Sequence, residues 1–344
     1  METSLRFIIS LFGDRHVGML LPLLYSIQKS NPDAAVSVYW EDINLDTVSL
    51  MQTAFPMVDW VKTNFNFSTD ITKRISSKML VWNQAAQEKC ATEKDWLLFL
   101  DADMLVRKDI LSFLKPIESD AVLTYRDGPF PINSGVVIFR AGKKSAQFFQ
   151  SWLDKTLEIL STPDLYAQAN NKHLPYGGAD QMALHLILDY ETSRRNYQIA
   201  LSDSQSLSLE LQRCEDLNET YSVPITDRTR IIHYKGGWRS ILFENGPFTR
   251  NRSKKDSWDM FVYYHTMYRE ALTFFDQKTG LHSTAERFGL TTPFFFNPVN
   301  GKFHSTLYLL HLIRWQITNF LPRLSRYTID QIRRFKKSFT QKSK

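Results

Sequence analysis

The segment Trp-Leu-Leu-Phe-Leu-Asp-Ala-Asp-Met, residues 96–104, decides the fold because a short apolar run leads directly into two carboxylates. Five consecutive apolar residues are typical of a strand buried inside an α/β sheet. In open α/β sheets, ligands bind beyond the carboxyl ends of the strands. Asp101 and Asp103 stand at that end, and alternate residues of an extended segment face the same side. The spacing predicts that both carboxylates reach one Mg²⁺ or Mn²⁺ ion, although a bare Asp-x-Asp also occurs as two solvated acids.

Around this segment, short apolar runs alternate with stretches of helical periodicity, which predicts an α/β fold with a mainly parallel central sheet flanked by helices. The strands expected from the pattern are 5–11, 35–40, 58–62, 96–100, 121–125, 135–140 and 230–233. The helices expected are 17–29, 44–53, 71–89, 146–160, 180–188 and 258–275. The stretch 202–218 is polar and poorly patterned, and no element is expected there.

Charge divides the chain into two parts. The 344 residues carry 42 Lys and Arg and 36 Asp and Glu, a net charge of +6. Residues 301–344 hold ten basic residues and one acid, a net charge of +9, which leaves residues 1–300 at −3. A nucleic-acid footprint over the whole protein is therefore disfavoured. We expect a catalytic domain in residues 1–300 and a basic helical appendage in residues 301–344.

The appendage combines apolar and basic residues in two expected helices, 305–320 and 327–339. Such helices are typical of segments that lie in an anionic membrane surface, where each basic residue contributes about 1 kcal/mol. The alternative is that the first helix packs on the body and the second is a solvated basic end. We favour the anionic membrane surface as partner, with no nucleic acid bound.

The apolar runs of the chain are too short for a secretion signal or a membrane span. The N-terminal run, residues 7–12, lacks the long apolar region of a signal peptide. Polar residues interrupt the stretch 306–321, which falls short of the roughly 20 apolar residues of a spanning helix. We therefore expect a cytoplasmic protein, peripheral at the inner face of the membrane, with both of its cysteines reduced.

Three further motifs follow the Asp-x-Asp segment. A polar pair and a glycine, Asn133-Ser134-Gly135, begin an apolar strand, and a glycine pair precedes Asp180-Gln181 at the start of a helix. A late strand ends at His233 and continues into a basic, glycine-rich turn, residues 234–239. Each motif alone has a structural explanation, as a turn cap, a linker or a structural histidine.

Taken together and in this order, the four motifs resemble those of nucleotide-sugar glycosyltransferases of the GT-A fold, in particular glycosyltransferase family 8, whose members retain the anomeric configuration. The resemblance runs from about Leu5 to Arg239. It includes the expected first helix, which ends in a pattern similar to that family's Ser-x-x-x-x-Asn-Pro, here Ser26 to Pro32. It departs from the family in the late turn, where Arg239 stands in place of a lysine and no Pro-Trp pair follows.

The resemblance implies a role for each motif residue. Asp101, Asp103 and His233 would hold the metal, and an imidazole added to two carboxylates favours Mn²⁺ over Mg²⁺. The residues implied to bind the donor are Asp14 near the base, Asp101 near the ribose, Lys78 and Arg239 near the diphosphate, Asn133 and Ser134 at the sugar, and also Gly236. Asp180 and Gln181 would be catalytic, beside the anomeric carbon.

The implied activity is metal-dependent transfer of a hexose from a nucleotide diphosphate sugar, with UDP as the expected nucleotide, to a glycan or lipid-linked acceptor. One alternative is a sugar nucleotidyltransferase, but these enzymes begin with a glycine-rich phosphate loop. The corresponding turn here, residues 12–16, has one glycine. The other alternative is a nucleotide-binding, membrane-surface protein on a degenerate transferase scaffold.

Overall fold

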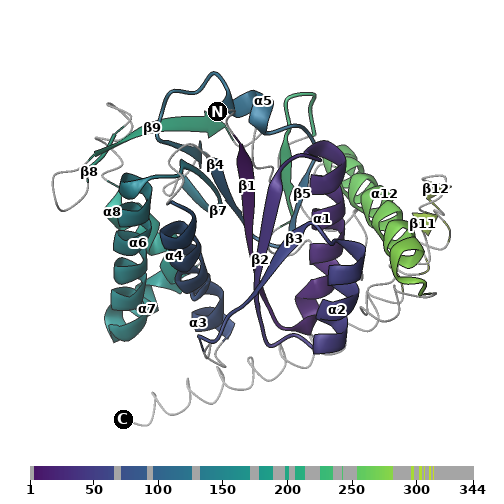
Figure 1. Ribbon diagram of the computed structural model, residues 1–344, viewed down its shortest axis with the longest axis horizontal. Helices are drawn as coiled ribbons and strands as arrows, with labels where there is room; N and C mark the ends of the chain where they lie inside the picture. Colours follow the sequence, from purple (N-terminus) through teal and green to yellow (C-terminus); the bar gives the residue numbers. More distant parts are fainter. Residues whose placement is uncertain are drawn as a thin grey trace, which may run out of the picture.

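The computed structural model describes residues 4–65, 71–90, 96–125, 132–170, 178–188, 198–200, 206–213, 225–234, 242, 254–281, 296–297, 302–303, 306, 310 and 313. Within these residues, a twisted central sheet separates two groups of helices (Figure 1). The expected α/β fold, with a mainly parallel central sheet between helices, is confirmed. The second expected helix of the appendage, residues 327–339, lies outside the described residues, as does most of the first.

Eight strands form the central sheet in the order β3-β2-β1-β4-β7-β6-β9-β8. Their bounds are β1 (Leu5–Phe12), β2 (Ala35–Glu41), β3 (Val58–Lys62), β4 (Trp96–Leu100), β6 (Ala121–Tyr125), β7 (Ile132–Arg140), β8 (Gln198–Ala200) and β9 (Ser206–Arg213). The first four strands in this order are parallel to one another. Strand β7 is antiparallel to both β4 and β6, while β6 and β9 are parallel.

Two layers of helices bury the two faces of the sheet. One layer contains α1 (Val17–Ser30), α2 (Leu45–Ala54) and α12 (Lys254–Thr279), and it packs against alternate residues of β1 such as Phe7 and Ile9. The opposite face carries α4 (Lys78–Lys89), α6 (Lys143–Ser161) and α8 (Ala179–Ile187), which pack around Ile8 and Phe99. The carboxyl ends of the parallel strands therefore lie together at one end of the sheet. In open α/β folds, ligand sites form at this end.

A second, small sheet positions part of that edge. Strand β5 (Met104–Val106) pairs antiparallel with β10 (Ile231–His233), so that His233 stands opposite Met104. Ser26 and Asn31 of the first-helix motif support this sheet from α1. The Ser26 hydroxyl accepts a hydrogen bond from Val106 N, and Asn31 donates to Lys108 O and accepts from Ile110 N.

Two local expectations are wrong. The expected helix 71–89 is divided into α3 (Ile71–Ser76) and α4 at Ser77, whose hydroxyl bonds back to Lys73 O, a contact that bends helices. Strand β9 lies within the stretch 202–218, where no element is expected. Among the described residues, no helix combines the length and apolar character needed to cross a bilayer.

Candidate functional site: an Asp-Asp-His cluster beside a buried lysine

The structure brings Asp101, Asp103 and His233 together at the carboxyl end of β4. One side-chain ligand atom from each lies within 4.8 Å of the other two. Two backbone hydrogen bonds fix this arrangement: Asp101 N donates to Gly135 O at 3.1 Å, and Tyr234 N donates to Asp103 O at 2.8 Å. The carboxylate side chains keep 28% and 30% of their surface exposed, so the cluster opens to solvent on one side.

The three side chains fit a small divalent cation. Asp103 Oδ1 is buried and accepts no hydrogen bond within the described part of the chain, although it lies 3.2 Å from His233 Nε2. Neighbouring ligands of an octahedral ion at about 2.1 Å stand about 3 Å apart, which matches this separation. Two carboxylates and an imidazole form a donor set suited to Mn²⁺ and also acceptable to Mg²⁺.

Gly135 in β7 leaves the space that the cluster occupies. A Cβ atom at this position would lie 2.8 Å from His233 Cε1 and 2.9 Å from Asp101 Oδ2. Real Cβ atoms do not approach other atoms so closely, so any side chain here displaces two of the three candidate ligands. The glycine of the Asn133-Ser134-Gly135 motif therefore serves the cluster directly.

Lys78, at the start of α4, lies behind the cluster. Its ammonium is 2.9 Å from Asp101 Oδ1, 3.2 Å from Asp180 Oδ2 and 3.3 Å from Ser134 O. Its Nζ lies over the ring of Trp82, 4.6 Å from the ring centroid, and only 7% of the side chain is exposed. Lys78 therefore connects α4 with the end of β4, with β7 and with α8, and is held inside the protein.

Electrostatic attraction governs the charge state of this group. Burial alone would lower the pKa of Lys78, but the carboxylates of Asp101 and Asp180 outweigh it and hold the pKa above its usual value. For Asp103, burial pushes the pKa upward, and the neighbouring His233, when cationic, more than offsets it, so the pKa lies below its usual value. Both groups are charged at neutral pH.

Asp180, at the start of α8, is buried and fully hydrogen bonded. Its Oδ1 accepts from the Ser76 hydroxyl at 3.0 Å, and its Oδ2 accepts from the Ser134 hydroxyl at 2.9 Å. The indole of Trp152 donates to the backbone oxygen of Asp180 at 2.8 Å. Ser76 and Trp152 were not predicted from the sequence, because a serine and a tryptophan inside helices carry no signal of this role.

The side-chain amides of Gln181 and Asn133 differ in how many of their polar atoms form hydrogen bonds. The Gln181 amide accepts from Ser134 N at 2.9 Å and donates to Ile132 O at 2.6 Å, so both of its polar atoms hold the backbone of β7. Asn133 accepts from Gly135 N at 2.8 Å, while its Nδ2 is buried without a hydrogen-bond partner among the described residues. Asn133 therefore keeps a free donor beside the cluster, and Gln181 does not.

The remaining predicted residues are placed less centrally. Asp14 lies at the carboxyl end of β1 in the short helix η1 (Asp14–His16), is exposed, and accepts a hydrogen bond from Asn44 N at 2.9 Å. Gly236 and Arg239 lie outside the described residues. The structure thus brings together Lys78, Asp101, Asp103, Asn133, Ser134, Asp180, Gln181 and His233.

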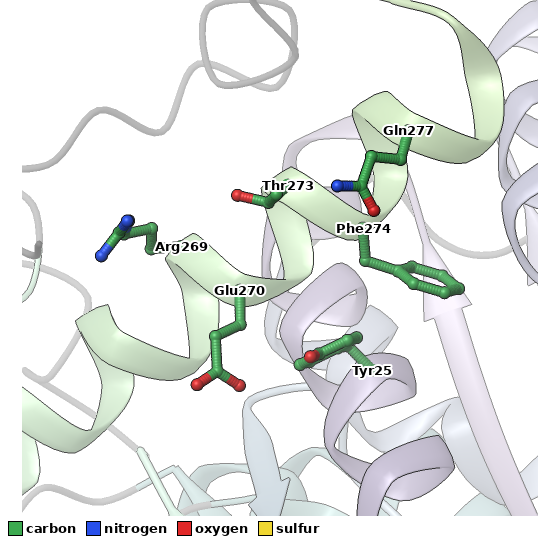
Figure 2. A pocket seen from close by; sticks show the side chains of 6 residues that line it. All are labelled: Tyr25, Arg269, Glu270, Thr273, Phe274 and Gln277. Atoms are coloured by element: carbon green, nitrogen blue, oxygen red, sulfur yellow. The ribbon is translucent and has the colours of Figure 1, made fainter.

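A separate pocket of about 330 Å³ is lined by side chains of α1 and α12 (Figure 2). Tyr25 of α1 lines it together with five residues of α12: Arg269, Glu270, Thr273, Phe274 and Gln277. Lys29 forms an ion pair with Glu270 at 2.6 Å, and the rings of Tyr25 and Phe274 are 5.5 Å apart. No strand end and none of the site residues named above contributes to this pocket.

No family model matches the sequence, and no curated protein sequence does. Solved structures resemble the fold. The glycosyltransferase GlyE of Streptococcus pneumoniae TIGR4 aligns with a TM-score of 0.46 at 12% identity, over 79% of this chain and 64% of that protein. The galactosyltransferase LgtC, solved with donor and acceptor sugar analogs, aligns with a TM-score of 0.49 at 10% identity. That alignment covers 82% of this chain and 99% of LgtC.

The bifunctional glycosyltransferase WbbM aligns with a TM-score of 0.41 at 11% identity, over 78% of this chain and 52% of that protein. This chain therefore spans less than two thirds of GlyE and about half of WbbM. A likeness of this degree assigns no substrate, and the function proposed below rests on the geometry of the site.

Proposed function

We propose that this protein is a metal-dependent glycosyltransferase that moves a hexose from a UDP-sugar to a glycan or lipid-linked acceptor, with retention of configuration. The observation that carries the proposal is the convergence of Asp101, Asp103 and His233 at the carboxyl end of a buried parallel strand. This is the edge where ligands bind in open α/β sheets. The donor set is one that suits Mn²⁺, which leaves coordination positions for phosphate oxygens.

The reaction needs positive charge where the sugar–diphosphate bond breaks, because negative charge develops on the leaving phosphate. A divalent ion supplies that charge when bound. Asp101, Asp103 and His233 would hold it at the strand end. Gly236 and Arg239, predicted from the resemblance, are proposed to contact the diphosphate, and a guanidinium can bind two of its oxygens at once.

The donor sugar is proposed to lie over Asn133, Ser134 and Asp180. The free Nδ2 of Asn133 suits a sugar hydroxyl, because an unpartnered buried donor is costly until it finds an acceptor. Gln181 acts on this pocket through the β7 backbone that it holds. Asp14 is proposed to contact the base at the end of β1.

The surroundings of Asp180 support retention. An inverting enzyme needs a carboxylate base behind the sugar to take the acceptor proton. Asp180, the residue that the sequence offers for this role, already accepts hydrogen bonds from Ser76 and Ser134 and faces the ammonium of Lys78. A carboxylate held in this way is placed to orient hydroxyl groups, because both of its oxygens already accept hydrogen bonds.

We also propose that residues 301–344 hold the protein at an anionic membrane surface as a peripheral protein of the cytoplasmic face. Leu310 and Ile313 are 57% and 48% exposed. Three residues apart, they lie on one side of a helix, where an apolar stripe can enter a bilayer interface.

The test is to incubate the full chain with each of a panel of UDP-sugars, with Mn²⁺ present or chelated. The amount of UDP released measures hydrolysis. Release from one donor that requires Mn²⁺ supports the proposal, and the anomer formed, read by NMR, reports retention or inversion. Nucleotide binding without release, repeated with acceptor glycans present, would favour the degenerate scaffold. Mn²⁺-independent release would contradict the metal role.

A further inference from the structure

Lys78 joins two parts of the site that the proposed function treats separately. Its ammonium contacts Asp101, which belongs to the metal cluster, and Asp180, which belongs to the sugar pocket. We propose that Lys78 is a positioning residue that couples divalent-ion binding at Asp101 to its own ion pair with Asp180. This inference rests on the proposed function, and it assigns Lys78 a role different from contact with the diphosphate.

The hydrogen-bonding capacity of Lys78 is already used. A lysine ammonium has three N–H donors. The three acceptors around Nζ are Asp101, Asp180 and Ser134 O, at 2.9, 3.2 and 3.3 Å. Because only 7% of the side chain is exposed and Nζ lies over the Trp82 ring, the described residues leave the ammonium little surface for an incoming phosphate.

Lys78 and a bound ion compete for the same carboxylate. Both oxygens of Asp101 face Nζ, at 2.9 and 3.2 Å. A divalent ion on Asp101 would weaken this contact and repel the ammonium. Lys78 would then turn toward Asp180, which the Ser76 and Ser134 hydroxyls prevent from moving.

Charge balance supports this coupling. Three carboxylates, Asp101, Asp103 and Asp180, meet one lysine and one imidazole among the described residues of the site. The three carboxylates and the lysine together carry a formal charge of −2, which one divalent ion balances. Without Lys78 the charge would be −3, so the lysine limits how strongly the cluster attracts the ion.

The experiment is calorimetric titration of the full chain with MnCl₂ in the absence of donor. We expect Lys78→Met to bind Mn²⁺ about tenfold more tightly or better, because a competing positive charge is removed. We expect Asp180→Asn to bind it more weakly by a similar factor, because Lys78 then pairs with Asp101 alone. A residue of purely structural importance would not move the affinity in opposite directions for these two changes.

The double variant Lys78→Met/Asp180→Asn separates coupling from simple charge effects. If Asp180 acts through Lys78, its substitution should change Mn²⁺ affinity about twofold or less once Lys78 is gone. An equal effect of Asp180→Asn in both backgrounds would overturn the coupling, as would weaker Mn²⁺ binding by a folded Lys78→Met protein.

Circular dichroism and the melting temperature establish which variants fold. Lys78→Arg keeps the positive charge and should stay within about threefold of the unaltered Mn²⁺ affinity. If Lys78→Met does not fold, the Mn²⁺ affinity of Asp180→Asn tests the inference. An affinity equal to that of the unaltered protein overturns it. Failure of the unaltered protein to bind Mn²⁺ would instead remove the proposed function, so the two failures are distinguishable.

Discussion

Asp103 is one of the three residues that form the proposed metal site. Its Oδ1 atom is buried beside His233 and accepts no hydrogen bond in the described part of the chain. We expect Asp103→Asn to reduce Mn²⁺-dependent turnover at least about a hundredfold. This loss exceeds the loss of activity that usually follows substitution of a residue that only hydrogen-bonds to a metal ligand. The free energy of unfolding should change by less than about 1 kcal/mol, because the side chain is partly exposed.

Urea denaturation and UDP-release assays on the same preparation check this prediction. Asp33→Asn is a suitable control, since this exposed carboxylate lies in the turn after α1, outside the site. The control should leave both measurements unchanged. Turnover by Asp103→Asn equal to that of the control would remove the central claim about the cluster.

Substitution of Gly135 tests whether the metal site depends on the space that this glycine leaves for the cluster. In Gly135→Ala, the new Cβ would meet His233 Cε1 at 2.8 Å and Asp101 Oδ2 at 2.9 Å, so ligand atoms must move. We expect a loss of about 1–3 kcal/mol in the free energy of unfolding, typical of overpacking, and at least tenfold weaker Mn²⁺ binding.

Gly142→Ala is the matched control for this substitution. Nothing lies within 4 Å of a Cβ at residue 142, and its φ of 163° is extended backbone that alanine adopts. Its stability should stay within about 1 kcal/mol and its Mn²⁺ affinity should not change. Equal Mn²⁺ affinities for the two variants would show that Gly135 does not shape the metal site.

At the scale of elements, α12 contains a buried titratable group. His265 is fully buried, with Nε2 2.9 Å from Leu242 O, and burial lowers its pKa to about 4. Between pH 6.5 and 4 the unfolded chain binds a proton that the folded chain does not, so the free energy of unfolding falls as the pH falls. The slope reaches about 1.4 kcal/mol per pH unit, and the whole effect about 3 kcal/mol.

Urea denaturation at pH 7 and pH 5 measures this contribution. His265→Gln can still donate to Leu242 O but does not titrate, so its stability should fall less between the two pH values than that of the unaltered protein. His185→Gln is the control, because His185 is partly exposed and its substitution should alter the pH dependence less. Parallel pH profiles for the unaltered protein and His265→Gln would contradict the prediction.

Element patterns in the sequence predicted the buried strands well, because apolar runs and helical periodicity report burial directly. Strand β4 has the predicted bounds and β1 extends one residue further. The break at Ser77 was missed because it depends on a side chain bonding back to Lys73 O. Strand β9 was missed although Ser-Leu-Ser-Leu-Glu-Leu, residues 206–211, alternates with the period of a strand.

At the scale of the whole molecule, the fold brings together motifs that lie far apart along the chain. Asp101 and His233 could be paired in advance only through the order of four motifs, since no local pattern links them. The contact between Lys78 and Asp180 was not predictable, because it depends on α8 placing Asp180 3.2 Å from the lysine ammonium. Sequence patterns predict which residues gather at the site, while the hydrogen bonds among them require the folded chain.

The distribution of charge over the molecule leads to the prediction about the membrane. The appendage carries a net charge of +9 against −3 on the remainder, and Leu310 and Ile313 are 57% and 48% exposed. We expect the full chain to sediment with vesicles that contain anionic lipid. Leu310→Ser with Ile313→Ser should weaken this binding at least tenfold, because burying each apolar side chain contributes about 1.5–3 kcal/mol.

The matched control is Leu157→Ser, because Leu157 is 44% exposed on α6 in the acidic body of the protein. It should leave vesicle binding unchanged. Replacing Arg333, Arg334, Lys336 and Lys337 by Gln should weaken binding to anionic vesicles and make it less sensitive to salt, since each basic residue contributes about 1 kcal/mol. Unchanged sedimentation of both appendage variants would mean that residues 301–344 do not bind the membrane surface. The charge separation would then require another partner.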